Sequence, residues 1–494
     1  MAAAWESLVT KLDELDDFSS ALKLLHWDQQ VMMPPEGARG RARTVATIEA
    51  AAHRLLTAPK IGELIAELSS AEGLDDVQAA SLRVLRRDYE MATKVPDELV
   101  RELAEVQGLA YAAWTRARPA DDFAILQPHL ERLVELKKRE ADALGWEDER
   151  YDALLDQYEP GATARGLAPM FEELVEGLKP LTDAALERSE PGADWLYASY
   201  EEGKQQAFCA WLVEQLGFDT SSGRLDRSPH PFTMGVGVGD VRQTVRTESS
   251  GVFGAVYAAM HETGHALYEQ GIPRELRGLP VGRVPSLGMH ESQSRLWENQ
   301  VGRSRAFTDY LLPHLKERFP EELGMVTPED FYAGVNRVQR SLIRVTADEL
   351  TYNLHIAVRL ELELAVFRDE LEVAALPSAF NAAMDRHLGI QPQSDADGVL
   401  QDMHWAIGAF GYFPTYTLGT LYAAALYDGA AQDLDGLEDD IRSGDTKRLL
   451  QWLRERIHTR GYMLESGALV EEVVGEPVGA KPLLAYLTDK YSEL

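Results

Sequence analysis

The segment His261-Glu262-Thr263-Gly264-His265 has the residue types and the spacing of a metal-binding helix. Two histidines four residues apart lie one turn apart on the same helix face, so both imidazoles can bind one metal ion. Glu262 lies beside them, where its carboxylate can accept a proton from a water molecule on that ion. Because the chain has only 12 histidines, chance alone would produce this pattern about 0.02 times in the chain. The segment therefore predicts a site in which a metal ion activates water for hydrolysis.

A catalytic zinc ion usually has three protein ligands and one open position. A loop rich in glycine and proline separates the metal helix from a second predicted helix, which Ser286 can cap. On that second helix Glu291, 26 residues after His265, is the favoured third ligand. His290 and Glu298 are its competitors, and Glu291 would face the histidines if the two helices packed antiparallel. Zinc is the expected metal, although cobalt or manganese ions can occupy ligands of the same kind.

The metal helix needs a defined beginning and end. We expect it to begin at Ser249 or Ser250, either of which can cap it, and to end at Gly271 and Pro273. Apolar residues recur at spacings of three and four along most of the remaining chain, which indicates amphipathic helices. The stretches with this period are 5–25, 40–57, 97–117, 126–144, 163–188, 203–216, 329–340, 343–371, 378–387, 399–410, 417–428, 447–459 and 481–492. The sequence therefore predicts a mainly α fold with residues 1–494 in a single domain, and two lobes about one cleft as an open alternative.

Residues 228–247 interrupt the helical pattern. Val236, Val238 and Val241 alternate with glycines there, which disfavours helix and favours strand. We expect a small hairpin or a three-stranded sheet with its turn near residues 239–240. Glycine within a strand often marks the close approach of another backbone, and an ordinary surface hairpin is the alternative.

The composition is that of a globular protein with a large core, since 45% of the 494 residues are hydrophobic and 26% are charged. The formal net charge of −32 argues against nucleic acid or an anionic membrane as a partner, because both bind basic surfaces. The single cysteine, Cys209, excludes an intrachain disulfide bond and fits a reducing compartment. No stretch is apolar enough for a membrane helix, and the N-terminus lacks the features of a secretory signal. We therefore expect a cytoplasmic protein.

Several further motifs resemble those of the M32 family of metallocarboxypeptidases, the group of carboxypeptidase Taq. These motifs occur in the family's order and are separated by long stretches of chain. They are His230-Pro231-Phe232, Asp240-x-Arg242-x-Thr244, His261-Glu262-x-x-His265, His290-Glu291-Ser292-Gln293, Ile343-Arg344-x-x-Ala347-Asp348 and Gly398-x-x-Gln401-Asp402-x-His404-Trp405. Residues 27–35 and 486–491 also match, so the resemblance covers essentially the whole chain.

The resemblance implies a largely helical peptidase with a long substrate groove and a small sheet beside the zinc helix. It also implies a zinc-dependent carboxypeptidase that removes single residues from the free C-terminus of peptides with broad specificity, and usually a homodimer. His261, His265 and Glu291 carry over as the metal ligands. Glu262 carries over as the general base that activates water and the general acid that protonates the departing amine.

Other residues are candidates for the remaining catalytic roles. Negative charge that develops on the attacked carbonyl needs a hydrogen-bond donor besides the metal ion. His404, Tyr412 and Tyr416 are candidate donors, with Tyr416 slightly favoured, and simple packing is the alternative for either tyrosine. His230 is either a pocket histidine or a hydrogen-bonded core residue.

Recognition of a free C-terminal carboxylate calls for an arginine, which can donate two parallel hydrogen bonds to it. Arg242, beside the glycine-rich strand, and Arg344 are the candidates. Each could instead form an ordinary ion pair, and Arg344 has Asp348 at the i+4 position that favours one. Because the chain carries a net charge of −32, its groove needs local positive charge to hold a peptide carboxylate. We therefore expect one or both arginines to bind the substrate.

Two other functions fit the metal motif. An endo-acting zinc oligopeptidase would share the motif and a downstream glutamate, but it should lack the two arginine-bearing motifs and should cleave peptides with amidated C-termini. A zinc-stabilised scaffold protein would more often use four cysteine or histidine ligands, for which one cysteine leaves little scope. The sequence favours the carboxypeptidase, and it does not specify the preferred C-terminal residues or the peptide length.

Overall fold

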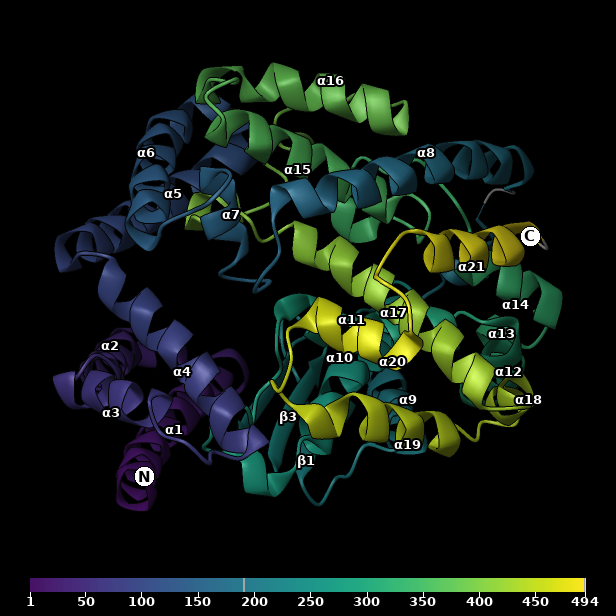
Figure 1. The fold of residues 1–494 in the computed structure, drawn as a ribbon. Coiled ribbons are helices and arrows are strands. Elements are labelled where there is room, and N and C mark those ends of the chain that lie inside the picture. The colour runs from purple at the N-terminus through teal and green to yellow at the C-terminus, as the bar shows by residue number, and fades with distance from the viewer. Residues whose placement is uncertain (190–191, 493) are drawn as a thin grey trace.

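The computed structural model describes residues 1–189, 192–492 and 494, and helices make up most of it (Figure 1). From the N-terminus these helices are α1 (Ala2–Val31), α2 (Ala38–Leu56), α3 (Pro59–Ser69), α4 (Asp76–Lys94), α5 (Asp97–Ala120), α6 (Gln127–Leu144), α7 (Arg150–Leu155), α8 (Ala164–Arg188), α9 (Glu202–Gln215), α10 (Phe253–Gly271), α11 (Leu287–Arg295), α12 (Arg305–Arg318), α13 (Pro320–Leu323), α14 (Pro328–Val335), α15 (Tyr352–Phe367), α16 (Leu376–Leu388), α17 (Pro414–Asp433), α18 (Leu437–Arg442), α19 (Lys447–Arg456), α20 (Ser466–Val474) and α21 (Lys481–Ser492). A π-helical turn, Leu296–Val301, continues α11. Short 3₁₀ turns lie at Pro35–Gly37, Phe123–Ile125, Asp194–Leu196, Arg274–Leu276, Arg344–Thr346, Val373–Ala375, Trp405–Ile407 and His458–Arg460. No helix in this part of the chain is both long enough and apolar enough to cross a membrane.

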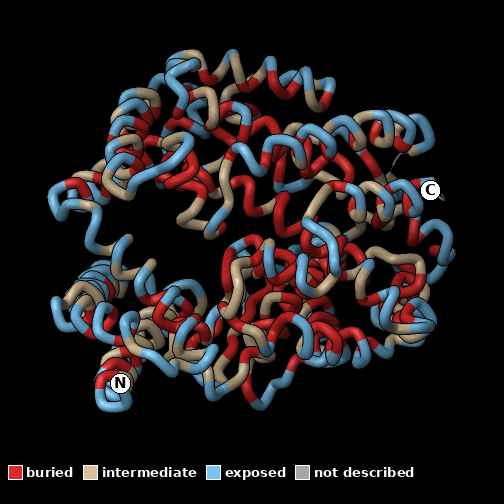
Figure 2. The backbone as a smooth tube through the Cα atoms, viewed as in Figure 1, coloured by how far each residue is buried: buried red, intermediate tan, exposed pale blue. Residues whose placement is uncertain are grey.

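Helix α17 runs through the middle of the molecule, between an upper and a lower group of helices (Figure 1). It contacts α11, α15, α20 and α21, and most of its side chains are buried. The main apolar core extends along the chain from Leu99 to Tyr491, and Figure 2 shows buried segments gathered in the middle of the molecule. Helices α1, α3 and α4 surround a separate apolar cluster that includes Leu8, Ile61 and Leu85.

The small sheet consists of β1 (Gly223–Arg227), β2 (Thr233–Gly237) and β3 (Asp240–Val245) in the order β1-β3-β2. β2 and β3 form the antiparallel hairpin that residues 228–247 predict, with Gly239 in the turn at a φ angle of 71°. β1 lies just before that segment and pairs with β3 in parallel. Both β2 and β3 contact α10, and β2 also contacts α1, so the sheet links the metal helix to the N-terminal helices.

The helix predicted over 343–371 is shorter in the structure. It begins only at Tyr352, because Asp348 stabilises a turn before it. The Asp348 carboxylate accepts hydrogen bonds from the backbone N–H groups of Leu350 and Thr351. Such local hydrogen bonds from a side chain compete with helix formation. The spacing of apolar residues alone does not reveal them.

The helix predicted over 399–410 is wrong. Apart from the 3₁₀ turn Trp405–Ile407, this stretch is a loop. Gly408 has a positive φ angle of 72°, which a right-handed helix cannot contain, and Gly411, directly after the stretch, has one of 85°. The loop conformation matters because His404 lies in it.

The ends of the two helices of the metal motif agree with the sequence in part. α10 begins at Phe253 without a side-chain cap, so the predicted caps Ser249 and Ser250 are wrong. The helix ends at Gly271, as predicted. Ser286 caps α11, as predicted, because its Oγ accepts a hydrogen bond from a backbone N–H three residues later.

Candidate active site

The three predicted metal ligands lie together. α10 supplies His261 and His265, and α11 supplies Glu291. Oε2 of Glu291 lies 3.6 Å from Nε2 of His261 and 3.5 Å from Nε2 of His265. One ligand atom from each side chain lies within 4.8 Å of the others. Two imidazole nitrogens and a carboxylate oxygen at these separations could hold one metal ion.

Two glycines allow the surrounding helices to come this close. A Cβ atom at Gly264 on α10 would lie 2.4 Å from the backbone oxygen of Gln293 on α11. A Cβ atom at Gly419 on α17 would lie 2.7 Å from both Cβ and Cγ of Glu291. A larger residue at either position would push its helix away, so the backbones themselves set the position of Glu291 relative to the histidines.

Glu298, on the π-helical turn, lies beside the ligand atoms rather than among them. Its Oε2 lies 2.9 Å from Nδ1 of His261. Although burial opposes ionisation, the hydrogen bond to His261 and the charge of Arg295 lower the pKa of Glu298 to about 2. An ionised carboxylate can only accept, so Nδ1 of His261 donates to Glu298, which leaves Nε2 as the nitrogen that would bind a metal ion. Glu298 thereby fixes the orientation and the tautomer of His261.

The charges at the site suit a cation. Burial opposes ionisation of Glu291, but Arg295, which donates from Nε to Oε1 over 2.8 Å, and the histidines hold its pKa well below the usual range. Burial also opposes charge on His261, yet Glu291 and Glu298 raise its pKa to about 9. Burial and a neighbouring histidine lower the pKa of His265 to about 3. Metal ligation requires ionised carboxylates and neutral imidazoles, so Glu291 and His265 are in the states that bind, and a divalent metal ion would displace the Nε2 proton of His261.

His290 also lies beside the ligand atoms. Its ring stacks on that of His265, with the ring centroids 4.2 Å apart and 14° between the ring planes. Its Nε2 lies 3.4 Å from Oε1 of Glu269. Of the three candidates for the third ligand, Glu291 is thus the one that joins the two histidines in a single cluster.

Glu262 lines a cavity of about 550 Å³ together with His261. Thr233 on β2 donates a hydrogen bond from Oγ1 to Oε2 of Glu262 over 2.6 Å. Burial raises the pKa of the Glu262 carboxyl above its ordinary value. A carboxylate with a raised pKa is a stronger proton acceptor, so Thr233 of the sheet orients a carboxylate that could act as a base beside the candidate metal ligands.

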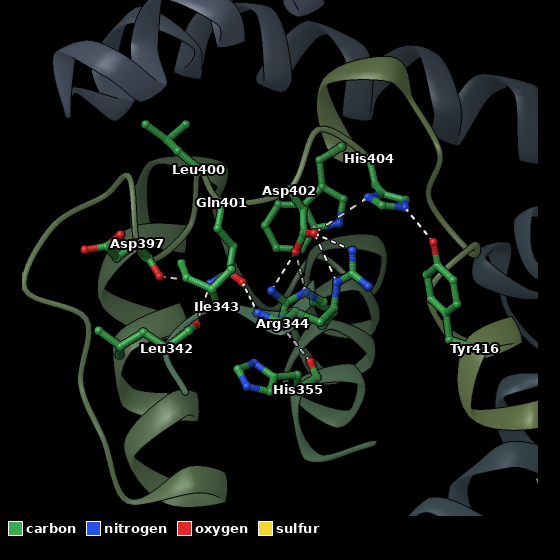
Figure 3. A network of polar contacts seen from close by, with 12 residues as sticks. Leu342, Ile343, Arg344, His355, Asp397, Leu400, Gln401, Asp402, His404 and Tyr416 are labelled. Carbon is green, nitrogen blue, oxygen red and sulfur yellow. Dashed lines mark hydrogen bonds and ion pairs between the residues drawn. The ribbon is translucent and has the colours of Figure 1, made fainter. Parts of the chain in front are cut away.

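His404, Tyr412 and Tyr416 lie together where the 402–412 loop leads into α17, and Figure 3 shows His404 pointing toward Tyr416. Nε2 of His404 lies 3.3 Å from the hydroxyl of Tyr416, and the ring centroids of Tyr412 and Tyr416 are 5.4 Å apart. Burial raises the pKa of both hydroxyls, and the negative charge of Glu291 adds to the effect. Both hydroxyls therefore stay protonated and can donate. Burial lowers the pKa of His404 to about 4, which leaves its imidazole neutral.

Arg344 is buried beside Tyr416 and is not paired with Asp348. Its Nε and Nη2 donate to Oδ1 of Asp402 over 3.0 and 2.8 Å, and its Nη1 donates to the Tyr352 hydroxyl over 3.1 Å. Its guanidinium carbon lies 5.1 Å from the centre of the Tyr416 ring. The structure thus joins two motifs that are far apart in the sequence, one with Arg344 and one with Asp402 (Figure 3).

Arg242 has different surroundings. Its Nε and Nη2 donate to the Asp240 carboxylate over 2.9 and 2.7 Å, and its guanidinium carbon lies 4.2 Å from the centre of the Trp27 ring. The next residue, Gln243, accepts a hydrogen bond from Thr263 of α10. Because successive side chains alternate across a strand, Arg242 lies on the sheet face away from the metal helix.

His230 is exposed, so the alternative of a core histidine is wrong. Its backbone oxygen accepts a hydrogen bond from Oγ of Ser228. The adjacent Pro231 lines the cavity that Glu262 borders, which places His230 near the rim of this cavity.

Sequence reasoning missed the residues that support these side chains. Thr233 directly follows a family motif, but a single threonine carries no signal of its own. Arg295 lies at the i+4 position from Glu291, and this spacing is typical of an ion pair. Arg359, which binds Asp402, lies outside every motif, and only the structure reveals it.

Comparisons with known proteins agree along the whole chain. The sequence profile of the family described as "Carboxypeptidase Taq (M32) metallopeptidase" matches residues 7–491. Thermostable carboxypeptidase 1 of Thermus thermophilus is 44% identical over 505 residues, which cover 100% of this chain and 99% of that protein. Carboxypeptidase 1 of Bacillus subtilis is 35% identical, and the match covers 98% of this chain and 97% of that protein.

Solved structures show the same fold. The M32 carboxypeptidase from Deinococcus radiodurans aligns with a TM-score of 0.97 and 40% identity over 99% of both chains. A structure of the Pyrococcus furiosus carboxypeptidase aligns with a TM-score of 0.97 and 37% identity, again over 99% of both chains. The predicted family and the predicted mainly α fold with a small sheet are therefore confirmed. The chain belongs to the carboxypeptidase Taq (M32) family and is a metallocarboxypeptidase.

Proposed function

We propose that this metallocarboxypeptidase holds a zinc ion through His261, His265 and Glu291 and removes single residues from the free C-terminus of peptides. One observation carries the proposal: the ligand cluster and the buried guanidinium of Arg344 both lie against the first turns of α17. The Glu291 side chain packs against Gly419, and the Arg344 guanidinium carbon lies 5.1 Å from the centre of the Tyr416 ring, about one turn earlier on the same helix. Zinc, when bound, would polarise the scissile carbonyl and lower the pKa of a water molecule. Cobalt or manganese ions could serve the same ligands.

Glu262 is the residue that moves the proton. Its raised pKa favours acceptance of a proton from the attacking water, and the carboxylic acid that forms then gives this proton to the departing amine. The Thr233 hydroxyl, which donates to Oε2, holds the carboxylate in one orientation during both transfers. No covalent intermediate is required, because water itself attacks the carbonyl.

The carbonyl oxygen that gains negative charge needs a hydrogen-bond donor. Tyr416 is our first choice, since its hydroxyl is protonated and lies 3.3 Å from Nε2 of His404. Tyr412 is the second choice. The neutral imidazole of His404 can orient the Tyr416 hydroxyl or donate directly, depending on its tautomer.

Arg344 is the proposed anchor for the substrate's C-terminal carboxylate. A guanidinium has five N–H donors, and bonds within the described chain use three of them. The remaining two belong to Nη1 and Nη2, so they can donate in parallel to one carboxylate. Arg242 remains the alternative anchor, on the sheet face that meets α1.

Further features follow from membership of the family rather than from particular contacts. We propose a long substrate groove with broad specificity, in which His230 contributes near the rim, and a homodimer that works in the cytoplasm. Peptides are the proposed substrates. The net charge of −32 gives no support for nucleic acid or an anionic membrane as a partner.

Incubation with a short peptide, followed over time by mass spectrometry, tests the proposal. We expect a ladder of products that lose residues one at a time from the C-terminus. The same peptide with an amidated C-terminus should be nearly inert, because it offers no carboxylate to Arg344. Rapid internal cleavage of the amidated peptide would instead favour the endo-acting oligopeptidase.

A further inference from the structure

The carboxylate of Glu363 on α15 is buried, with 1% of the residue exposed, and three donors surround it. Oε2 accepts hydrogen bonds from the Tyr151 hydroxyl over 2.7 Å and from the backbone N–H of Gly411 over 2.9 Å. Oε1 accepts one from Nε1 of Trp405 over 2.7 Å. Two of these three donors, Trp405 and Gly411, belong to the 402–412 loop.

Each of those two attachment points is the direct neighbour in sequence of a proposed catalytic residue of the loop. Trp405 directly follows His404, and Gly411 directly precedes Tyr412. The loop has little regular structure of its own, since only Trp405–Ile407 forms a 3₁₀ turn. A short irregular segment keeps one conformation only if other elements hold it, and here the Glu363 carboxylate holds both ends.

Arg359, one turn before Glu363 on α15, holds the first residue of the same loop. Its Nε and Nη2 donate to Oδ2 of Asp402 over 2.8 and 2.6 Å, and its Nη1 donates to the backbone oxygen of His355 over 2.8 Å. The other carboxylate oxygen of Asp402 accepts from Arg344. Two guanidiniums therefore share the carboxylate of Asp402, so Asp402 is not the partner of Arg344 alone.

We propose that Arg359 and Glu363 are positioning residues of the active site, which act from α15 through the 402–412 loop. Glu363 sets the places of His404 and Tyr412 at the reacting carbonyl. Arg359 binds the Asp402 carboxylate as well, so Asp402 does not fully neutralise Arg344. Arg344 therefore keeps positive charge and N–H groups for the substrate's carboxylate. The inference rests on the proposed function, because it assigns the supports of residues whose own roles are proposed above.

A purely structural role explains these buried charges less well. Buried ion pairs are often no more stabilising than apolar residues of the same volume, so stability alone gives little reason for them. The loop partners of Arg359 and Glu363 lie within one short segment, and that segment carries His404, a proposed hydrogen-bond donor. Small displacements of such groups cost far more in rate than in stability.

The first test is Glu363→Gln. An amide places an NH₂ group where a carboxylate oxygen was, so it must face the N–H of either Trp405 or Gly411 and release one end of the loop. We expect kcat to fall about tenfold or more, with KM for a free-carboxylate peptide changed less than about twofold. Assays at about pH 8 keep Glu363 ionised, because burial raises its pKa to about 7. If this variant does not fold, Trp405→Phe removes one attachment and should lower kcat in the same direction.

The matched control is Tyr151→Phe, which removes a donor to the same carboxylate without touching the loop. It should change the melting temperature but leave kcat within about twofold of the native value. Equal kcat values for Glu363→Gln and Tyr151→Phe would overturn the role of Glu363.

The second test compares Arg359→Gln with Arg359→Lys. When the positive charge of Arg359 is removed, Asp402 pairs with Arg344 alone and neutralises it. Arg359→Gln should therefore raise KM for the free-carboxylate peptide about tenfold and change kcat little. Lysine restores the charge but not the paired donors, and it should recover KM in part. An unchanged KM in Arg359→Gln would overturn the role of Arg359.

Direct variants separate this inference from the proposed function. If His404→Ala and Arg344→Ala both leave the kinetics unchanged, the proposed catalytic roles themselves are wrong. If those two variants impair catalysis while Glu363→Gln and Arg359→Gln match native kinetics, only the positioning inference is wrong.

Discussion

Nδ1 of His261 lies 2.9 Å from Oε2 of Glu298, whose other oxygen lies 3.4 Å from Nη2 of Arg303. The sequence allowed Glu298 to compete with Glu291 for the metal ion, and in the structure its carboxylate lies against Nδ1 of His261, itself a proposed ligand. A carboxylate behind a histidine ligand fixes the ring and raises its basicity. The two glutamates therefore have distinguishable effects on metal binding.

Glu298→Gln should weaken zinc affinity about 10- to 100-fold without removing the site, the usual effect of losing such a partner. Glu291→Ala removes a ligand and should weaken it much more. Competition with a chelator of known affinity measures both. Glu269→Gln, which touches His290 but no proposed ligand, serves as the control. Tight zinc binding in Glu291→Ala together with its loss in Glu298→Gln would show that Glu298 is the third ligand.

Glu262→Gln should keep its metal and lose catalysis. The amide has the same shape but cannot accept a proton, and loss of general base catalysis costs at least about 10²-fold in kcat. Thr233→Val, which removes only the hydrogen bond to Oε2, should have a smaller effect. Metal analysis and steady-state kinetics on the same preparations check both, and near-native turnover in zinc-loaded Glu262→Gln would exclude its role as the base.

Arg344→Ala should lower kcat/KM for free-carboxylate peptides by about 2–4 kcal/mol of transition-state stabilisation, the range for a lost desolvated charge pair. Arg344→Lys should recover only part of it, because lysine lacks the paired donors. Arg242→Ala, on the other sheet face, should have a smaller effect. A larger loss of kcat/KM in Arg242→Ala than in Arg344→Ala would show that Arg242 binds the substrate's carboxylate.

The ion pairs of Asp402 should make stability depend on pH in acid. Burial opposes its ionisation, but Arg359 and Arg344 hold the pKa of Asp402 well below its usual range. A carboxyl with a lowered folded-state pKa contributes stability that is fully present above its unfolded-state pKa of about 3.9 and is lost as the pH falls through the folded-state value. The melting temperature of Asp402→Asn should therefore lie below the native value by a constant amount above about pH 5, and the gap should narrow below about pH 4. A gap that widens in acid would contradict the assignment.

Gly419→Ala should disturb the metal site although residue 419 binds no metal. Its Cβ would lie 2.7 Å from the Glu291 side chain, and overpacking of this kind costs about 1–3 kcal/mol. Gly108→Ala, in α5, is the control, since a Cβ there meets nothing within 4 Å and should stabilise by about 0.5–1 kcal/mol. Calorimetry measures the stability of both variants, and zinc titration measures their affinity for zinc. Unchanged zinc affinity in Gly419→Ala would mean that α17 does not set the position of Glu291.

The sequence predicts best what depends on local periodicity. His261 and His265 are close in any helix, and the cap at Ser286 and the hairpin over 228–247 follow from short-range preferences. The loop around His404 could not be predicted in this way. Its apolar residues keep a helical period, while positive φ angles at two glycines and attachments from α15 prevent a helix there.

Partners that lie far apart in sequence define the rest of the site. Arg344 has an acidic residue at the i+4 position, yet it pairs with Asp402, 58 residues away. Arg359 lies in no motif and has no local signal. The third-ligand role of Glu291 and the roles of the two tyrosines stay predictions until the variants are measured.

The glycine contacts at Gly264 and Gly419 also bear on how the protein acquires its metal. They lock three helices by backbone packing, and Ser294 and Arg295 hold the Glu291 carboxylate from its own helix. Folding can therefore bring the three proposed ligands together before any metal ion binds. A zinc finger differs, because its folding needs the metal. The metal ion would then act as an ordinary ligand of the native state, and the stabilisation that it gives would grow with the logarithm of its free concentration. A chelator should lower the melting temperature gradually and reversibly, and the same folded molecules should recover activity when zinc is returned.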